Sequence, residues 1–196
     1  TKALRPGIAY LLRRNEMIKF VKSIDNISKY QCGKLPKNAK KLKAPASMAE
    51  MMKKSMPVVV ILCVVMILAM FTKMYLSHTR VVSKPAIIGG LLLGFSLLIV
   101  HEWLHAIVYP KEAQVTIGKL KGKMVFVALA SYPLNRARFI LMCLLPFLLG
   151  VIPLTLFLLA SPHATVFNGL MFGMACVGMV SPYPDVYNAI LVLKQA

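Results

Sequence analysis

The stretch from Pro85 to Tyr109 has the sequence PAIIGGLLLGFSLLIVHEWLHAIVY. About 20 apolar residues in helical form cross the hydrocarbon core of a bilayer, so this stretch predicts a transmembrane helix. His101, Glu102 and His105 lie inside it as the motif HEWLH. On a helix the two histidines share one face, one turn apart, where their ring nitrogens can hold one zinc ion while the glutamate reaches a metal-bound water. The pattern therefore indicates hydrolytic chemistry.

The alternative interpretation of HEWLH is a chance match, because the motif specifies only three positions. Its location argues against chance. An acid within a membrane-spanning helix costs up to about 2.5 to 3.5 kcal/mol on insertion scales, so Glu102 is a functional residue by default.

The composition is that of a membrane protein. Hydrophobic residues make up 58% of the 196 positions, with a mean hydropathy of +0.70. Four stretches are long enough to cross a bilayer, which predicts an all-α polytopic membrane protein with about four transmembrane helices. The stretches are Pro57 to Leu76, Pro85 to Tyr109, Phe139 to Ala160 and Ala164 to Leu193.

The basic residues are distributed unevenly along the chain, whose net charge is +18. Residues 1–56 hold fourteen Lys and Arg, the loop from Thr72 to Lys84 holds three, and the segment from Lys111 to Arg138 holds six. Under the positive-inside rule, the first and third of these segments are cytoplasmic, so both termini lie inside. The charges flank the apolar stretches instead of forming a stripe with interleaved aromatic residues, which argues against a nucleic-acid partner.

Two regions are expected. Residues 1–56 form a basic cytoplasmic arm, and residues 57–193 form a four-span membrane domain. Within the arm, residues 8–30 place apolar side chains near helical spacing among Arg and Lys. That spacing predicts an amphipathic helix lying on an anionic leaflet, with a solvated cytosolic extension as the alternative.

Asp185 is the other carboxylate, besides Glu102, within the apolar stretches. It follows Pro182 and Pro184, which must break the helix, and broken helices at membrane depth occur where backbone lines a cavity or a site. Catalytic zinc usually takes three protein ligands plus water, so Asp185 is the candidate third ligand. The alternative is that it caps the short helix after Pro184. Asn188, one turn later, is a candidate to orient a ligand or to form an interhelical hydrogen bond.

Pairs of glycines allow the second and fourth stretches to pack closely: Gly90 and Gly94 in one, Gly169 and Gly173 in the other. His105 follows Gly94 by eleven residues, and Asp185 follows Gly173 by twelve. At about 1.5 Å per residue, both side chains lie roughly 16 to 18 Å below the glycines. The depths of the two candidate ligands therefore agree.

The segment from Gln114 to Ala130 predicts a short β-hairpin between the second and third spans, with Lys121 and Gly122 as its turn. An edge strand there could pair with an extended peptide and present it to the zinc site. A plain amphipathic loop is the alternative.

These features resemble a known clan. An HExxH motif on one membrane helix, a hairpin-like segment after it and a proline-containing stretch ending in Asp are similar to the site-2 proteases. More closely, the chain resembles the zincin peptidases of the DUF3267 family, small four-span bacterial membrane proteins. The similarity runs from Leu35 to Leu193 and includes LPKNAKKL, HEWLHA, PLNRARFI and PDVYN. One difference is that Val186 follows Asp185, where classical site-2 proteases have Asp-Gly.

The resemblance implies that His101, His105 and Asp185 bind Zn²⁺ and that Glu102 is the general base. We therefore expect an intramembrane zinc metallopeptidase in a bacterial cytoplasmic membrane, with the bilayer and a membrane protein or peptide substrate as its partners. The alternative is a catalytically inactive zinc-binding scaffold. Glu102 separates the two, because a purely structural zinc site has no use for that acid.

Overall fold

The computed structural model describes residues 17–30, 36–37, 42–43, 45, 47–122 and 125–195. The chain divides into two compact units, each made of two segments. One unit comprises residues up to 41 together with residues 102–142. The other comprises residues 42–101 and 143–196. We call the first the sheet unit and the second the helical unit.

All four predicted apolar stretches are helical. Three helical segments are long and apolar enough to cross a membrane: Ala49–Ser77, Lys84–Val108 and Arg136–Leu159. The fourth stretch consists of two helices, Thr165–Val180 and Tyr183–Gln195, bent by 40° at the break between them. The described residues therefore contain three candidate spans, or four if the bent pair is one span.

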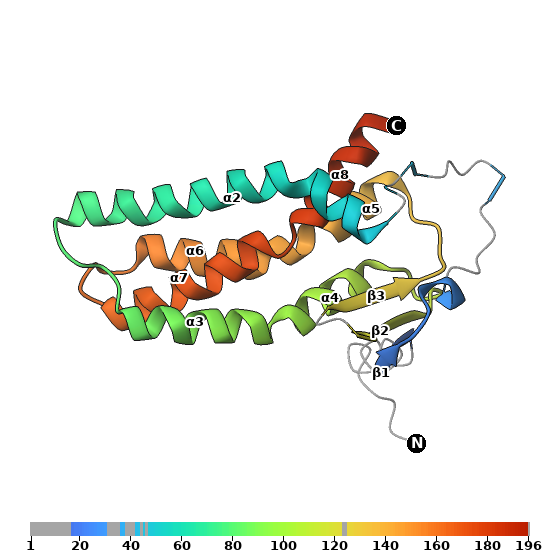
Figure 1. Cartoon of the computed structure of the whole chain (residues 1–196), viewed down its shortest axis with the longest axis horizontal. Coiled ribbons are helices and arrows are strands. Elements are labelled where there is room, and N and C mark those ends of the chain that lie inside the picture. The colour runs from blue at the N-terminus through green and yellow to red at the C-terminus, as the bar shows by residue number, and fades with distance from the viewer. Residues whose placement is uncertain are drawn as a thin grey trace, which may run out of the picture. The chain divides into compact units, whose positions relative to one another are not determined.

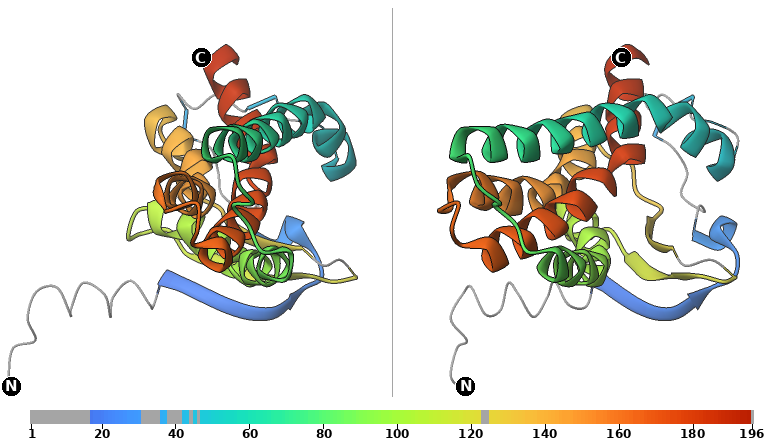
Figure 2. Two further views of the ribbon diagram at one scale, coloured as in Figure 1. Left: turned by 90° about the vertical axis from the view of Figure 1, so that its left-hand side faces the viewer. Right: turned by 60° about the vertical axis from the view of Figure 1, so that its left-hand side comes forward.

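The helical unit is a bundle around one central helix (Figures 1 and 2). It contains α2 (Met48–Ser77), α3 (Lys84–Ser96), η2 (Leu145–Phe147), α6 (Leu148–Leu159), α7 (Thr165–Val180) and α8 (Tyr183–Gln195). Helix α7 packs against α3, α6 and α2, while α8 packs against α2. Leu62 and Met66 of α2 meet Ala175 and Met179 of α7 in the core of the unit.

The predicted close packing of glycines is confirmed. A Cβ atom added at Gly90 would lie 2.9 Å from the carbonyl carbon of Leu170 and 3.0 Å from the Cα of Gly173. A Cβ added at Gly173 would meet Leu91 N at 2.8 Å. Backbone therefore touches backbone between α3 and α7, which only residues without a side chain permit.

Large apolar side chains point outward from the helical unit. Helices with this exterior are suited to a hydrocarbon surrounding, because an exposed apolar surface of this extent is unusual on a soluble monomer. Residues at least 57% exposed include Val60, Ile61, Leu68, Phe71, Ile88, Leu92, Leu159 and Val166.

Lys73 differs from the expectation that it belongs to a basic loop between the first two spans. It lies inside α2, is 7% exposed, and donates from Nζ to Ala160 O at 2.8 Å and Asn168 Oδ1 at 3.0 Å, and also to Phe157 O. The carbonyls of Phe157 and Ala160 lie at the C-terminal end of α6, where a helix leaves acceptors without intrahelical partners. The lysine therefore joins α2, α6 and α7, and it does not contribute to the charge of the loop.

The sheet unit contains a three-stranded sheet in the order β1-β2-β3. Strands β2 (Val115–Leu120) and β3 (Phe126–Ala130) are antiparallel and confirm the predicted hairpin, with Gly122 at φ 73° in its turn. Strand β1 (Ile18–Ile24) pairs with β2 in parallel, so that Ile18 faces Val115 in the register. The 3-10 helix η1 (Ile27–Tyr30) follows β1.

The amphipathic helix predicted within residues 8–30 is wrong where the structure describes them, because residues 18–24 form a strand. Residues 8–16 lie outside the described residues. The reason is tertiary: Ile18 is buried with Ala106, Val115 and Ile117, and the β1 backbone pairs with β2. The edge position of β1 is visible in Figure 2, where it is the blue arrow.

Candidate metal centre

The HEWLH motif lies on α4 (Leu98–Val108), which follows α3 after Leu97. His101 and His105 are buried, at 6% and 8% exposure, whereas Trp103, between them in sequence, is 41% exposed. The helical period of 3.6 residues puts positions four apart on one face, so the motif turns both imidazoles inward. Glu102 is half-buried beside them.

The potential ligand atoms of His101, Glu102 and His105 all lie within 4.8 Å of one another. This is the one such cluster among the described residues. Two imidazole nitrogens one turn apart and a carboxylate match the nitrogen and oxygen donors that zinc takes in proteins. The residues present therefore fit a zinc ion.

Asp185 reaches His101. Helix α7 ends at Val180, and Ser181 and Pro182 form a turn before α8 begins at Tyr183. The predicted break therefore occurs at Pro182, while Pro184 lies in the first turn of α8, where a proline is tolerated. The bend directs Oδ2 of Asp185 to within 3.3 Å of Nε2 of His101. Because α8 begins two residues earlier, Asp185 lies in the first turn and not at the N-cap position of the alternative interpretation.

Straight helices would bring Asp185 to the depth of His105, whereas the contact in the structure is with His101, one turn closer to the glycines. The 40° bend between α7 and α8 shortens the axial distance from Gly173 to Asp185.

His105 has a backbone partner that sequence reasoning missed. Its Nδ1 lies 2.9 Å from the carbonyl oxygen of Met142, on α5 (Arg136–Leu144). A carbonyl can only accept, so Nδ1 carries the proton and Nε2 keeps its lone pair. Histidines that bind metals commonly donate their other ring N–H in this way, which orients the ligand nitrogen.

Asn188 lies one turn after Asp185 on α8 and is half-buried. In the described part of the chain its side chain makes no hydrogen bond to Asp185 or to either histidine. Its role in orienting a ligand stays a prediction.

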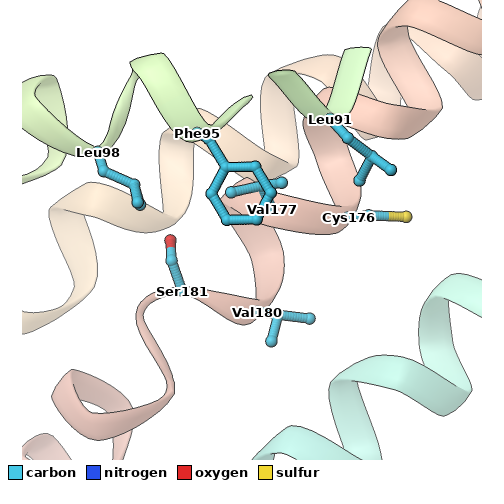
Figure 3. A pocket seen from close by; sticks show the side chains of 7 residues that line it. All are labelled: Leu91, Phe95, Leu98, Cys176, Val177, Val180 and Ser181. Atoms are coloured by element: carbon cyan, nitrogen blue, oxygen red, sulfur yellow. The ribbon is translucent and has the colours of Figure 1, made fainter. Parts of the chain in front are cut away.

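An apolar pocket of about 280 Å³ lies between α3 and α7, next to the helices that carry His101 and Asp185 (Figure 3). Leu98 of the pocket is three residues before His101, and Ser181 is four residues before Asp185. Figure 3 shows the Phe95 ring lying across the pocket beside Val177. The lining residues are Leu91, Phe95, Leu98, Cys176, Val177, Val180 and Ser181.

Two histidines and a glutamate gathered on one helix turn define the HExxH class of candidate metal sites. The family comparison agrees: the model of DUF3267, described as "Putative zincin peptidase", matches residues 94–196, more than half of the chain. The chain therefore belongs to the DUF3267 family. Comparisons with curated proteins and with solved structures found no match.

Proposed function

We propose that the protein is an intramembrane zinc metallopeptidase of the site-2 protease type, which hydrolyses peptide bonds in membrane-embedded or membrane-proximal substrates. One observation carries this proposal. A zincin-type motif whose ligand atoms lie within 4.8 Å sits on an apolar helix of spanning length, and a proline-broken helix brings a carboxylate onto one of its histidines.

In the proposed site, His101, His105 and Asp185 hold the zinc ion, and Glu102 takes and delivers protons. Zinc in such a site supplies Lewis-acid activation of a water molecule and of the scissile carbonyl. Glu102 is adjacent to His101 on the helix, so its carboxylate can accept a proton from the attacking water and pass it to the leaving amine. The carbonyl of Met142 holds the His105 ring in one orientation.

The substrate class follows from the surroundings of the site. Outward-facing apolar residues on α2 and α3 support a position in the bilayer. The apolar pocket between α3 and α7 suits an aliphatic or aromatic side chain near the scissile bond, because it begins one helical turn from His101. Among the described residues, β3 pairs with β2 along one edge, and we propose that its other edge pairs with an extended peptide.

The orientation proposed from the positive-inside rule places both termini and the hairpin in the cytoplasm. Cysteine labelling in intact cells tests it. A probe cysteine at Lys121 should be protected from an impermeant reagent, and one at His78 should react. The reverse pattern would place the site toward the other side of the membrane.

The catalytic proposal is tested by measuring zinc content and cleavage of a transmembrane peptide side by side. We expect Glu102→Gln to keep the zinc and to lower the rate by at least about 10²-fold, because the amide cannot take the proton. Asp185→Ala should instead weaken zinc retention, since it removes a ligand. Glu112→Gln, at an exposed loop position, is the matched control and should change neither.

The zinc content and the cleavage rate together show which part of the proposal has failed. If Asp185→Ala holds zinc as tightly as the parent, the third-ligand assignment is wrong. If Glu102→Gln still cleaves, the general-base mechanism is wrong. A parent protein that binds zinc and cleaves none of a panel of transmembrane peptides would favour the zinc-binding scaffold instead.

A further inference from the structure

The carbonyl oxygen of Met142, which accepts the hydrogen bond from Nδ1–H of His105, cannot form the backbone hydrogen bond that its position in a helix would normally give it. Within an α-helix, the carbonyl of residue 142 would accept from the backbone N–H of residue 146. Residue 146 is proline, which has no N–H to donate. The α-helical partner of Met142 O is therefore missing for a chemical reason that is written in the sequence.

The local structure agrees with this account. Helix α5 ends at Leu144, the 3-10 turn η2 takes in Leu145–Phe147, and α6 continues from Leu148. Pro146 is fully buried within that turn. The 3-10 turn thus begins three residues after Met142, whose carbonyl oxygen lies 2.9 Å from Nδ1 of His105.

A second proline of the same span serves as an internal comparison. Pro153 lies inside α6 and is also buried. The carbonyl four residues before it belongs to Leu149, and that oxygen lies against Gly178 of α7, where an added Cβ atom would collide with it. The carbonyl that Pro153 deprives of a helical N–H donor therefore lies at a backbone contact between helices. The carbonyl that Pro146 deprives of one lies at the candidate metal centre.

We propose that Pro146 is a positioning residue of the metal centre. By withholding an amide hydrogen, it reserves the Met142 carbonyl for Nδ1–H of His105 and so keeps Nε2 as the nitrogen available to a metal. The proposal rests on the proposed zinc site for its functional meaning. The hydrogen bond and the tautomer of His105 are properties of the metal-free protein.

The test compares Pro146→Ala with Pro153→Ala in the full-length chain in detergent micelles. Zinc affinity is measured by competition with a chromophoric chelator, and the tautomer of His105 by ¹⁵N NMR of the metal-free protein. We expect Pro146→Ala to weaken zinc binding about 10- to 100-fold, the usual effect of losing a partner that orients a ligand. It should also shift the His105 ring away from the Nδ1–H tautomer, while Pro153→Ala should change neither property.

A third variant separates the N–H from the ring of proline. The α-hydroxy acid analogue of alanine at position 146 makes an ester, which lacks both the N–H and the ring. We expect it to bind zinc as the parent does. An ester variant as weak as Pro146→Ala would mean that ring packing, and not the missing N–H, is responsible, and the proposal would be overturned.

The proposal and the proposed function fail in different ways. A parent that binds no zinc refutes the zinc site, yet the ¹⁵N measurement still decides whether Pro146 controls the His105 tautomer. Equal zinc affinity and equal tautomer in the parent and Pro146→Ala refute the positioning role alone. If Pro146→Ala does not fold, an ester at position 143, which weakens the Met142 carbonyl as an acceptor and keeps Pro146, should lower zinc affinity and shift the tautomer; no change in either would refute the role.

Discussion

Replacing Gly90 by alanine tests the contact between α3 and α7 that brings the two halves of the site together. The new Cβ would lie 2.9 Å from the carbonyl carbon of Leu170 and 3.0 Å from the Cα of Gly173, where ordinary contacts are 3.4 to 4 Å. Both atoms belong to backbone, so the helices must separate. Overpacking of this kind costs about 1 to 3 kcal/mol.

Gly89→Ala is the matched control, one position earlier on the same helix. Its Cβ would meet only the Cδ2 atom of Leu170, at 3.3 Å, and that flexible side chain can move aside. Both substitutions gain the same helix propensity, about 1 kcal/mol, so their difference isolates the packing. We expect Gly90→Ala to be less stable than Gly89→Ala by about 1 to 3 kcal/mol.

The free energy of unfolding can be measured by denaturant titration in mixed micelles, and zinc affinity on the same samples. Helix α3 leads into His101, and α7 leads into Asp185. Separating the two helices should therefore lengthen the 3.3 Å contact between His101 and Asp185 and weaken zinc binding. If the two variants unfold at the same denaturant concentration, the helices do not touch at Gly90. If only Gly90→Ala is destabilised but zinc affinity is unchanged, the packing does not control the site.

Two more predictions concern the helical unit. Lys73→Met should destabilise the fold by about 1 to 3 kcal/mol in thermal unfolding, because it leaves the carbonyls of Phe157 and Ala160 without their donor, whereas Lys54→Met, at an exposed ion pair, should change the melting temperature little. Phe95→Ala should enlarge the pocket and shift cleavage toward peptides with bulkier side chains, whereas Leu92→Ala, 66% exposed on the same helix, should not; an unchanged preference would separate the pocket from the substrate.

Local features of the chain were predictable from the sequence. His101 and His105 are four residues apart, and the helical period alone puts them on one face. The helix break before Asp185 follows from Pro182 and Pro184, and the close contact of α3 with α7 from their paired glycines. Each of these depends on residues that are neighbours along one helix or on a backbone property of proline or glycine.

Some partners could be found only in the folded chain. The apolar spacing of residues 18–24 is compatible with a helix, yet this segment pairs with residues 115–120, far along the chain, and becomes a strand. The sequence predicts Lys73 as one of the charges of the Thr72 to Lys84 loop, whereas in the fold it donates to Ala160 at the end of α6 and to Asn168 of α7, both far along the chain.

That a histidine pair and a glutamate share one turn of an apolar helix follows from their spacing alone, because the helical geometry is repeated every 3.6 residues whatever surrounds it. The atoms that contact these side chains come from distant parts of the chain, and the spacing does not predict them. The tertiary structure placed Asp185 on His101 rather than His105 and set the carbonyl of Met142 against the His105 ring. Contacts between distant segments depend on the bend angle between helices and on how closely the helices approach, and both are set by the packing of the bundle.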